Sequence, residues 1–459
     1  MTPPRVLVLG GGIAGLAAAW ECHRRGMPAV VLEAQPRAGG LIRTDIAGPY
    51  VLDAGPDAFL VTKPGAIGLC RELGIDSQLI GMKTPRGAYV LRDDELHALP
   101  EGGAFGIATR LGPFLRSTLL SKGGKCRVAV EPLVPCRRGT TDESAGSFFR
   151  RRFGVEAASW IAQPLLGGIH AGDLDRLSAS SVFPQLVDLE RRGRSVLLGL
   201  RRHAARPSAG GAFRSFPSGM ATLTGAMVAQ LPPGTVRLGT LITTMTRHGD
   251  RWRVRSADGS THDADLVVVA VPAHVAAEVL PAVSPDVAAS CGMIRYVSSA
   301  AALLVYRARD IARPLSGSGY VTGPARRPDP VMATSWLTGK WDGRAPHGFT
   351  VLRGFFGGDR DEGSASLPDD TLIALAHDSW ARRFGIVGRP VLARTVRWVK
   401  GSPQHEVGHL ARIREIDARL GALSGVAVAG SGFRAVGIPD VITDARSTAR
   451  DLLDRWRAR

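Results

Sequence analysis

The sequence predicts an α/β protein built around a Rossmann-like nucleotide-binding domain, and three observations near its start support this class. The run Arg5–Leu9 (RVLVL) is short, apolar and β-branched, which is typical of a buried parallel strand. It leads into the glycine cluster Gly10–Gly15, after which Leu16–Arg25 has a helical composition. A second apolar run, Ala29–Leu32, ends at Glu33. Strand, glycine turn, helix and strand form one βαβ unit of about 30 residues.

The spacing Gly10-x-Gly12-x-x-Gly15 gives each glycine a separate task. Gly10 permits a tight turn, Gly12 lets a pyrophosphate approach the backbone, and Gly15 lets helix and strand pack closely. The helix N-terminus then offers free N–H groups to the phosphates. Glu33 lies 23 residues after Gly10, where its carboxylate can accept hydrogen bonds from a ribose diol. We therefore expect a bound dinucleotide.

Four features favour FAD as that dinucleotide. The fingerprint lies at the beginning of the sequence, and the pair Gly39–Gly40 follows Glu33 closely, with Arg37 between them. Asp53–Pro56 forms another turn that allows close approach. The segment Val426–Trp456 has the pattern strand, loop, helix and provides a second helix N-terminus. A chain that returns to the ligand at its end suits a long flavin site.

The remaining sequence alternates between helical and strand patterns. Residues 64–80 and 83–206 are typical of mainly helical structure. A final helix over Pro439–Trp456 keeps its apolar residues at helical spacing, and proline suits the first helical position. Strand-like runs occur at Val236–Ile242, Arg251–Ser256, Asp265–Val271, Ala300–Tyr306, Phe349–Phe356 and Val426–Ala429.

Composition excludes several classes of protein. A chain of 459 residues with 44% hydrophobic and 22% charged residues is neither disordered nor fibrous. No apolar segment reaches the ~18 residues of a membrane span, and no secretory signal precedes the first strand, so we expect a cytoplasmic protein. The five cysteines show no CxxC or zinc-ligand spacing, so we expect reduced thiols and no metal site.

The net charge of +17 is unevenly distributed. Residues 110–206 contain 17 Arg or Lys and 8 Asp or Glu, a net charge of +9. Such a field favours an anionic membrane surface or a polycarboxylate substrate, although a solvated arginine-rich face gives the same count. Nucleic acid is not expected as a partner, because no zinc finger, RNA-binding or basic-zipper motif is present.

The chain resembles the FAD-dependent porphyrinogen oxidases, the family of protoporphyrinogen oxidase and coproporphyrinogen III oxidase. The matching segments at 6–20, 30–40 and 51–60 are shared with the wider amine oxidase-like flavoproteins, whereas those that contain GGIHAGD and SPQHEVGH are closer to the porphyrinogen branch. The resemblance covers essentially the whole chain. Its segments are VLVLGGGIAGLAAAW (6–20), VVLEAQPRAGG (30–40), VLDAGPDAFL (51–60), QPLLGGIHAGDLDRLS (163–178), GSPQHEVGHLARI (401–413) and GFRAVGIPDVI (432–442).

The resemblance implies a fold of the p-hydroxybenzoate hydroxylase type, with interleaved domains and a mainly helical insertion. We expect an FAD-binding domain at 1–80, 207–290 and 425–459, a mainly helical, basic region at 81–206 that either meets the membrane or covers the substrate, and a substrate-binding domain at 291–424. Implied FAD contacts are Gly10, Gly11, Gly12, Ile13, Ala14, Gly15, Glu33, Ala34, Arg37, Gly39, Gly40, Leu41, Gly55, Pro56, Asp57, Ala58, Ile242, Gly430, Val436, Gly437 and Ile438.

The implied substrate contacts are fewer. The family's propionate-binding arginine falls on Arg86, and positions of the substrate site fall at Leu165, Gly168, Ser318 and Gly319.

Two further expectations concern FAD. Ile242 is expected to end a strand whose backbone meets the adenine. Some amine oxidases bind flavin covalently through a cysteine in the last glycine loop, but this loop reads Gly430–Phe433 (GSGF), so we expect non-covalent FAD.

The resemblance implies removal of six electrons from a porphyrinogen, in three two-electron rounds with dioxygen as acceptor, within haem biosynthesis. Alternatives are another flavin amine oxidase or a carotenoid desaturase-like oxidoreductase. Implied partners are a tetrapyrrole, dioxygen, the inner face of an anionic membrane, and a ferrochelatase that takes the product. MATSWLTGKW (332–341) is similar to the coproporphyrinogen branch, and Lys340 would add positive charge for a four-carboxylate substrate.

The histidines do not point to catalysis. His405 and His409 are four residues apart but have no third ligand, and Gly408 weakens a helix between them, so we expect a structural role. His170 also suits a packed or surface position. No catalytic base is assigned, because pyrrole and imine protons can exchange through tautomers.

Overall fold

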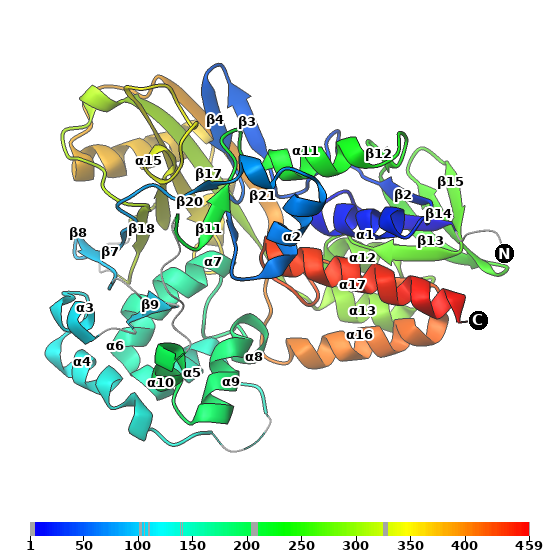
Figure 1. Ribbon diagram of the computed structural model, residues 1–459, viewed down its shortest axis with the longest axis horizontal. Helices are drawn as coiled ribbons and strands as arrows, with labels where there is room; N and C mark the ends of the chain where they lie inside the picture. The colour runs from blue at the N-terminus through cyan, green and yellow to red at the C-terminus, as the bar shows by residue number, and fades with distance from the viewer. Residues whose placement is uncertain are drawn as a thin grey trace.

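The computed structural model describes residues 5–100, 103–104, 106–108, 111–137, 139, 141–202, 210–324 and 329–458. Its first and last described segments meet in one five-stranded parallel sheet of order β12-β2-β1-β16-β22 (Figure 1). This sheet confirms the predicted Rossmann-like α/β class. Its strands are β1 (Val6–Leu9), β2 (Ala29–Leu32), β12 (Val236–Arg237), β16 (Leu266–Val269) and β22 (Val426–Val428).

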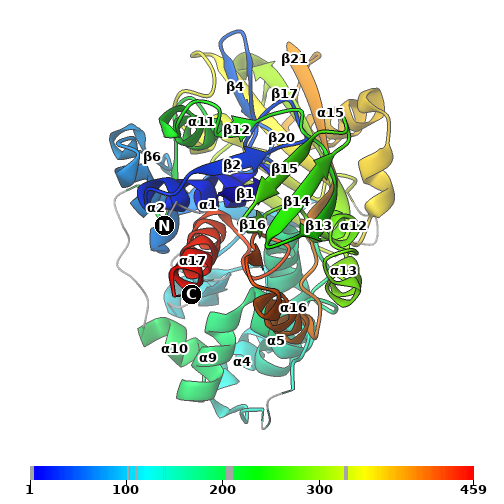
Figure 2. The ribbon, with the colours of Figure 1, turned by 90° about the vertical axis from the view of Figure 1, so that its right-hand side faces the viewer.

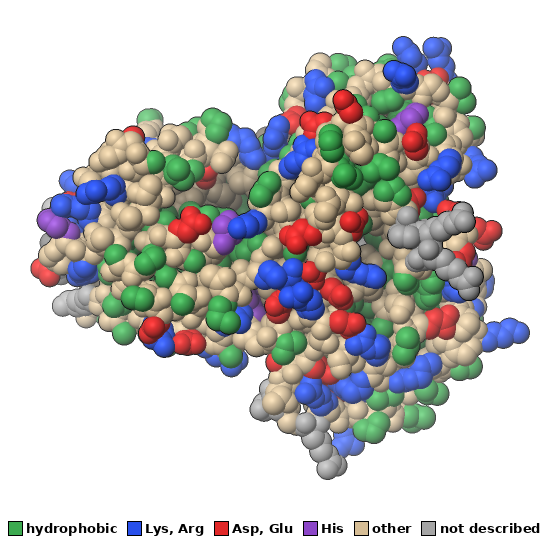
Figure 3. Space-filling view, turned by 180° about the vertical axis from the view of Figure 1, so that it is seen from behind, with side chains coloured by type: hydrophobic (Ala, Val, Ile, Leu, Met, Phe, Trp, Pro, Cys, Tyr) green, Lys and Arg blue, Asp and Glu red, His purple; other side chains and the backbone are tan. Residues whose placement is uncertain are grey.

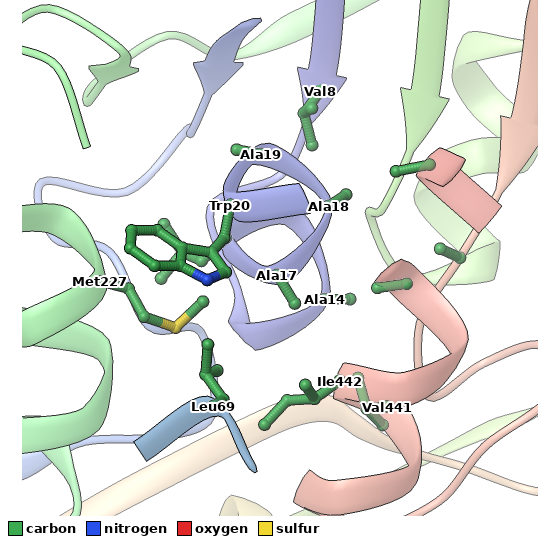
Figure 4. Close-up of a cluster of buried hydrophobic side chains, with 14 of the residues drawn as sticks. Val8, Ala14, Ala17, Ala18, Ala19, Trp20, Leu69, Met227, Val441 and Ile442 are labelled. Atoms are coloured by element: carbon green, nitrogen blue, oxygen red, sulfur yellow. The ribbon is translucent and has the colours of Figure 1, made fainter. Parts of the chain in front are cut away.

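Side chains of β1 enter two separate cores, because successive residues of a strand point to opposite faces of the sheet. Val6 and Val8 contact one helical layer: α1 (Ile13–Arg24), α2 (Pro64–Glu72), α11 (Ala221–Gln230) and α17 (Ile438–Arg457). In this layer Trp20 of α1 lies beside Leu69 and Met227 (Figure 4). Full burial stabilises the fold by roughly 1.5–3 kcal/mol for each large apolar side chain.

Leu7 and Leu9 contact the opposite layer, which combines helices with a small antiparallel sheet (Figure 2). The helix α16 belongs here, although its residues fall within the predicted substrate segment 291–424. Its apolar face, which includes Ile413 and Ile416, packs in the same core as Val428 of β22. The elements of this layer are α12 (Ala273–Val279), α13 (Pro285–Gly292), α16 (His409–Leu423), β13 (Ile242–His248), β14 (Arg251–Ser256) and β15 (Thr261–Ala264).

A second, seven-stranded sheet has the order β21-β17-β20-β19-β18-β7-β8. Helix α15 (Asp369–Phe384) covers one face, and Leu52 and Ala54 pack on the other. Two of its strands, β7 and β8, come from the segment 83–206, which was predicted as mainly helical. These residues form strands because β7 pairs in parallel with β18, a strand far away in the sequence. The strands are β7 (Ala88–Arg92), β8 (Glu95–Ala98), β17 (Tyr296–Arg307), β18 (Gly319–Thr322), β19 (Ala333–Trp336), β20 (Phe349–Gly357) and β21 (Leu392–Pro403).

The described chain between residues 111 and 202 is mainly helical and has a core of its own that includes Phe148, Phe149 and Phe153. A fully buried ion pair, Arg152 with Glu131, ties the region together: Glu131 also accepts a hydrogen bond from Ser195 Oγ at 2.6 Å. The elements are α3 (Leu111–Arg116), α4 (Lys122–Ala129), η2 (Glu131–Leu133), α5 (Ala145–Phe153), α6 (Val155–Ala157), the π-helix η3 (Ala158–Gly167), α7 (Gly168–His170), α8 (Ala179–Val182), α9 (Pro184–Gly193) and α10 (Val196–Arg202).

Short elements connect these parts. They are β3 (Thr44–Ala47), β4 (Tyr50–Asp53), β5 (Phe59–Leu60), η1 (Asp76–Gln78), β6 (Ile80–Gly81), β9 (Gly103–Ala104), β10 (Ile107–Ala108), β11 (Phe213–Ser215), η4 (Ala308–Asp310), α14 (Leu337–Lys340) and η5 (Glu362–Ser366). Within the described ranges, none of the helices has both the length and the apolar character that crossing a membrane requires.

The predicted strand Val236–Ile242 is wrong as a single element. Its first two residues form β12 against β2, whereas Ile242 begins β13 and pairs with Ser256. Gly239, at φ +69°, turns the chain between the two strands. Ile242 therefore starts a strand rather than ending one.

Candidate functional site

The glycine loop that joins β1 to α1 has the geometry of a phosphate cradle. Gly10 has φ +100°, and a Cβ on Gly15 would lie 1.8 Å from the Gly10 carbonyl oxygen. At Gly12 a Cβ would meet nothing nearer than Gly40 Cα, at 3.9 Å. Gly12 is also the N-cap of α1 and supplies no side chain to occupy the N–H groups of the first turn. This open helix start fits the pyrophosphate of a dinucleotide.

Glu33 is fixed at the carboxyl end of β2. Its Oε2 accepts a hydrogen bond from Gly11 N at 2.5 Å, and its Oε1 accepts one from Gln35 N at 2.7 Å. The neighbouring Ala34 is exposed. Thr240 N donates to the Glu33 carbonyl at 2.8 Å, so the chain leading to Ile242 passes directly beside this residue. A buried carboxylate held in one orientation next to the glycine loop fits the role of ribose acceptor.

The Arg37–Leu41 loop lies across the glycine loop. Gly39 N donates to Gly11 O at 2.8 Å, and the Arg37 guanidinium donates to Gly40 O at 2.6 Å. Burial lowers the pKa of Arg37. Gly39 and Gly40 both have positive φ, and a Cβ on Gly40 would meet Gly12 Cα at 3.0 Å. Two loops from separate parts of the chain thus line the same space.

The turn Asp53–Ala58 approaches this loop, since a Cβ on Gly55 would lie 1.9 Å from Leu41 O. Pro56 and Ala58 are half-buried on either side of Asp57. The Asp57 carboxylate is buried and pairs with Lys340 at 2.5 Å and Arg353 at 3.0 Å. Burial alone would raise the pKa of Asp57, but these two cations lower it well below its usual range.

The expected role of Lys340 therefore needs correction. Its ammonium group is largely buried and is neutralised by Asp57, so its charge is not free for a substrate carboxylate. Arg353 was not expected from the sequence as a site residue. It donates to Gly55 O at 2.5 Å and to Asp53 O at 2.6 Å. A lone arginine inside the apolar run Phe349–Phe356 was the signal that could have revealed it.

The last glycine loop closes the site from the other end of the chain. A Cβ on Gly430 would lie 3.5 Å from Ala14 Cβ, beside Ile13 and Ala14 at the start of α1. Gly437, at φ +94°, is the N-cap of α17 and, like Gly12, leaves the first turn without a side-chain cap. Val436 is half-buried before it, and Ile438 is buried after it. The beginning and end of the described chain thus contribute two uncapped helix starts to one site.

Three of the expected substrate contacts are brought together. Arg86 is exposed, and its Nε donates to Met82 O at 3.2 Å. Ser318 N donates to Gly87 O at 2.6 Å, and Gly319 pairs with Ala88 in the parallel strands β7 and β18.

The other two expected substrate contacts, Leu165 and Gly168, lie on the helical side. Leu165 belongs to η3, which contacts β7 and β18, whereas Gly168 is exposed with open space around its Cβ position.

His405 and His409 both hold the last glycine loop. His405 Nε2 lies 2.8 Å from Ser431 O, and His409 Nε2 lies 2.6 Å from Phe433 O. The rings are stacked with centroids 3.9 Å apart. Burial lowers the pKa of His405 to about 4 and that of His409 to about 3, and it lowers the pKa of the nearby His170 to about 4. All three are neutral at pH 7.

Trp398 and Gln404 are further residues at the site that the sequence patterns did not single out. Trp398 Nε1 lies 3.4 Å from Ala54 O, and its ring is 3.7 Å from the Cβ position of Gly55. Gln404 Nε2 donates to His170 O at 3.0 Å, which links the SPQHEVGH segment to the GGIHAGD segment.

Together these features define a flavin-dependent oxidoreductase. The two uncapped helix starts, the buried Glu33 and the glycine cradle fit FAD, which supplies two-electron redox chemistry when bound. The chain belongs to the flavin-containing amine oxidoreductase family, which matches residues 13–453.

Individual relatives extend over nearly the whole chain. The coproporphyrinogen III oxidase of Bacillus subtilis (strain 168) is 34% identical over 98% of this chain and 97% of its own. That of Propionibacterium freudenreichii is 32% identical over 98% and 90%. The solved structure named "Putative protoporphyrinogen oxidase" from Exiguobacterium sp. 255-15 has a TM-score of 0.87 and 28% identity, covering 99% of this chain and all of its own.

Replacing Gly12 by valine tests the cradle. The Cβ position at Gly12 is open, so we expect Gly12→Val to fold but to lose FAD, because the side chain fills the space that the pyrophosphate needs. Bound flavin is measured by absorbance after purification. Gly15→Ala is the comparison variant. Its Cβ would clash with the Gly10 carbonyl, so we expect this substitution to destabilise the fold itself and not only to weaken FAD binding. A folded Gly12→Val protein with full flavin would contradict the assignment.

Acid should destabilise the protein through the three buried histidines. Their folded pKa values lie below the ordinary 6.5, so their stabilising effect is present above pH 6.5 and is lost as the pH falls toward 4. Each contributes a slope of up to about 1.4 kcal/mol per pH unit. We expect urea unfolding of the FAD-loaded His170→Leu variant between pH 7 and 4.5 to show a shallower slope than the wild type. The exposed His347→Leu control should keep the wild-type slope, and equal slopes for His170→Leu would contradict this account.

Proposed function

We propose that this protein oxidises a porphyrinogen to the corresponding porphyrin, with coproporphyrinogen III as the preferred substrate. The observation that carries the proposal is the exposed Arg86, whose chain neighbours Gly87 and Ala88 pair with Ser318 and Gly319, in a chain whose full-length relatives are named coproporphyrinogen III oxidase. No carboxylate in the described part of the chain pairs with Arg86. A free guanidinium there suits a substrate propionate, which it can bind through a charge-assisted hydrogen bond.

The reaction removes six electrons and six protons from the macrocycle. A flavin accepts two electrons at a time, so three rounds are needed, and dioxygen as acceptor would yield three hydrogen peroxide molecules per porphyrin. The chain's own part is to orient the substrate through Arg86 and to keep FAD in place through the loops at Gly12, Gly40 and Gly430. The loop Gly430–Phe433 contains no cysteine, so FAD is held non-covalently.

An assay with both porphyrinogens tests the proposal. We expect porphyrin fluorescence to rise with coproporphyrinogen III faster than with protoporphyrinogen IX, with peroxide and porphyrin in a ratio of three to one. Benzylamine should give no peroxide. Turnover of the amine, or of neither porphyrinogen by the FAD-loaded protein, would overturn the proposed function.

Arg86→Ala should raise KM for coproporphyrinogen III and leave FAD content unchanged. Loss of a hydrogen bond to a charged group costs about 1.5–3 kcal/mol, which corresponds to a roughly 10- to 150-fold lower kcat/KM. Lys83→Ala is the matched control, because Lys83 is an exposed cation that pairs with Asp342 at 3.3 Å. An unchanged KM in Arg86→Ala would remove this residue from the substrate site.

The helical region is proposed to contact an anionic membrane. Seen from behind, basic and apolar side chains intermingle on its surface (Figure 3). Within the helical region Leu115, Leu133 and Val155 are exposed, and Lys125 Nζ donates to Leu115 O at 2.8 Å. Exposed apolar groups in a region of net positive charge suit insertion between anionic lipid headgroups. Hand-off of the product to a ferrochelatase and a location at the inner membrane face stay predictions.

Flotation with liposomes tests this contact. We expect the protein to float with phosphatidylglycerol vesicles at low salt but not at high salt, since screening weakens the attraction. Leu133→Asp should reduce flotation, whereas Val387→Asp, which changes an equally exposed apolar residue beside the seven-stranded sheet, should not. Equal flotation of both variants would contradict the proposed surface.

A further inference from the structure

The His405–His409 pair contacts the loop Gly430–Phe433 at two carbonyls that flank one glycine. His405 Nε2 lies 2.8 Å from Ser431 O, and His409 Nε2 lies 2.6 Å from Phe433 O. Both side chains are almost completely buried, and their rings are nearly parallel, at 11°. The two imidazoles therefore act on the loop as one unit.

The hydrogen-bond partners of the two rings determine which nitrogen of each histidine carries the hydrogen. A carbonyl oxygen only accepts, so Nε2 carries the hydrogen in both rings. His405 Nδ1 then accepts from the Ser181 hydroxyl, 3.0 Å away. His409 Nδ1 is buried without a hydrogen-bond partner, which a neutral ring tolerates better than a charged one. Each ring is thus a neutral donor aimed at the loop.

The loop has little freedom to settle elsewhere. A Cβ on Gly432 would lie 2.1 Å from Tyr296 Oη, so the backbone rests directly on that hydroxyl. Gly430 N lies 3.3 Å from Asp444 Oδ2, and Gly430 faces Ala14 at the start of α1. The histidines hold one end of this loop, and its other end borders the phosphate cradle.

We propose that His405 and His409 are positioning residues for FAD: their Nε2–H groups hold the Ser431 and Phe433 carbonyls so that Gly430 stays where it contacts the cofactor. The inference rests on the cofactor placement of the proposed function, in which Gly430 is an FAD contact. It does not depend on which substrate is oxidised, because every readout below can be made without substrate.

The experiment compares His→Leu with His→Gln at each position in the FAD-reconstituted protein. Leucine removes the donor, whereas the glutamine Nε2–H restores it without a ring. We expect His405→Leu and His409→Leu to weaken FAD binding at least tenfold and to shift the visible flavin absorption band and the reduction potential at saturating FAD. Each Gln variant should recover FAD affinity to within about threefold of the wild type. His347→Leu, an exposed histidine, is the control and should change neither property.

A merely structural role predicts a different result: a lower Tm with an unchanged flavin spectrum, potential and FAD affinity, and this outcome would overturn the proposal. Should the Leu variants fail to fold, Ser181→Ala replaces them. It removes only the hydroxyl that fixes the His405 ring, and we expect FAD to bind two- to fivefold more weakly with a spectral shift in the same direction. An unaltered spectrum and affinity in folded Ser181→Ala would also overturn it. A wild-type protein that binds no FAD would refute the cofactor placement itself, whereas normal FAD binding without porphyrinogen turnover would refute only the proposed substrate.

Discussion

The contact between the two ends of the described chain is the constraint on which the rest of the structure depends. β1 pairs with β16, β16 pairs with β22, and α1 packs against α17 in one apolar core. As a consequence the glycine loop after β1 and the loop after β22 open toward the same space. Each loop leads into a helix whose first turn has no side-chain cap, so the two helix starts together offer more unpaired N–H groups than either provides alone.

A second constraint joins the two sheets. Arg353 on β20 donates to the carbonyls of Asp53 and Gly55 and pairs with Asp57, while Lys340 and Trp341 bind the same Asp57 carboxylate. The turn that approaches the Arg37–Leu41 loop is therefore held by residues on or next to strands of the seven-stranded sheet. Removing one member would leave a buried charge unpaired, which is far costlier than losing a surface ion pair. The cluster thus couples the position of the Asp53–Ala58 turn to that of the large sheet.

The environment of His405 and His409 determines what these two side chains do. The four-residue spacing of His405 and His409 predicted only a structural role. In the fold the two rings stack on each other, and both lie within hydrogen-bond distance of carbonyls of one loop. Their low pKa values result chiefly from burial, and the neutral rings serve as directional donors. Gln404, next to them, donates to the His170 carbonyl, so a single segment contacts both the last glycine loop and the chain around His170.

Local signals were sufficient to predict the βαβ unit, its glycine turn, the place of Glu33 at the end of β2 and the closing helix, because each depends on residues adjacent in sequence: glycine where φ is positive, apolar runs where strands are buried, and helical spacing along α17. They did not predict that residues 88–92 and 95–98 form strands, that Ile242 begins a strand, or that Lys340 pairs with Asp57. Strand pairing and helix docking join segments far apart in the chain, and whether a lysine faces a ligand or a carboxylate depends on which segment lies opposite. The sequence by itself determined the kind of cofactor site; only the tertiary structure decided which charges neutralise one another and which, like Arg86, have no carboxylate partner among the described residues, since electrostatic partners are chosen by distance in space.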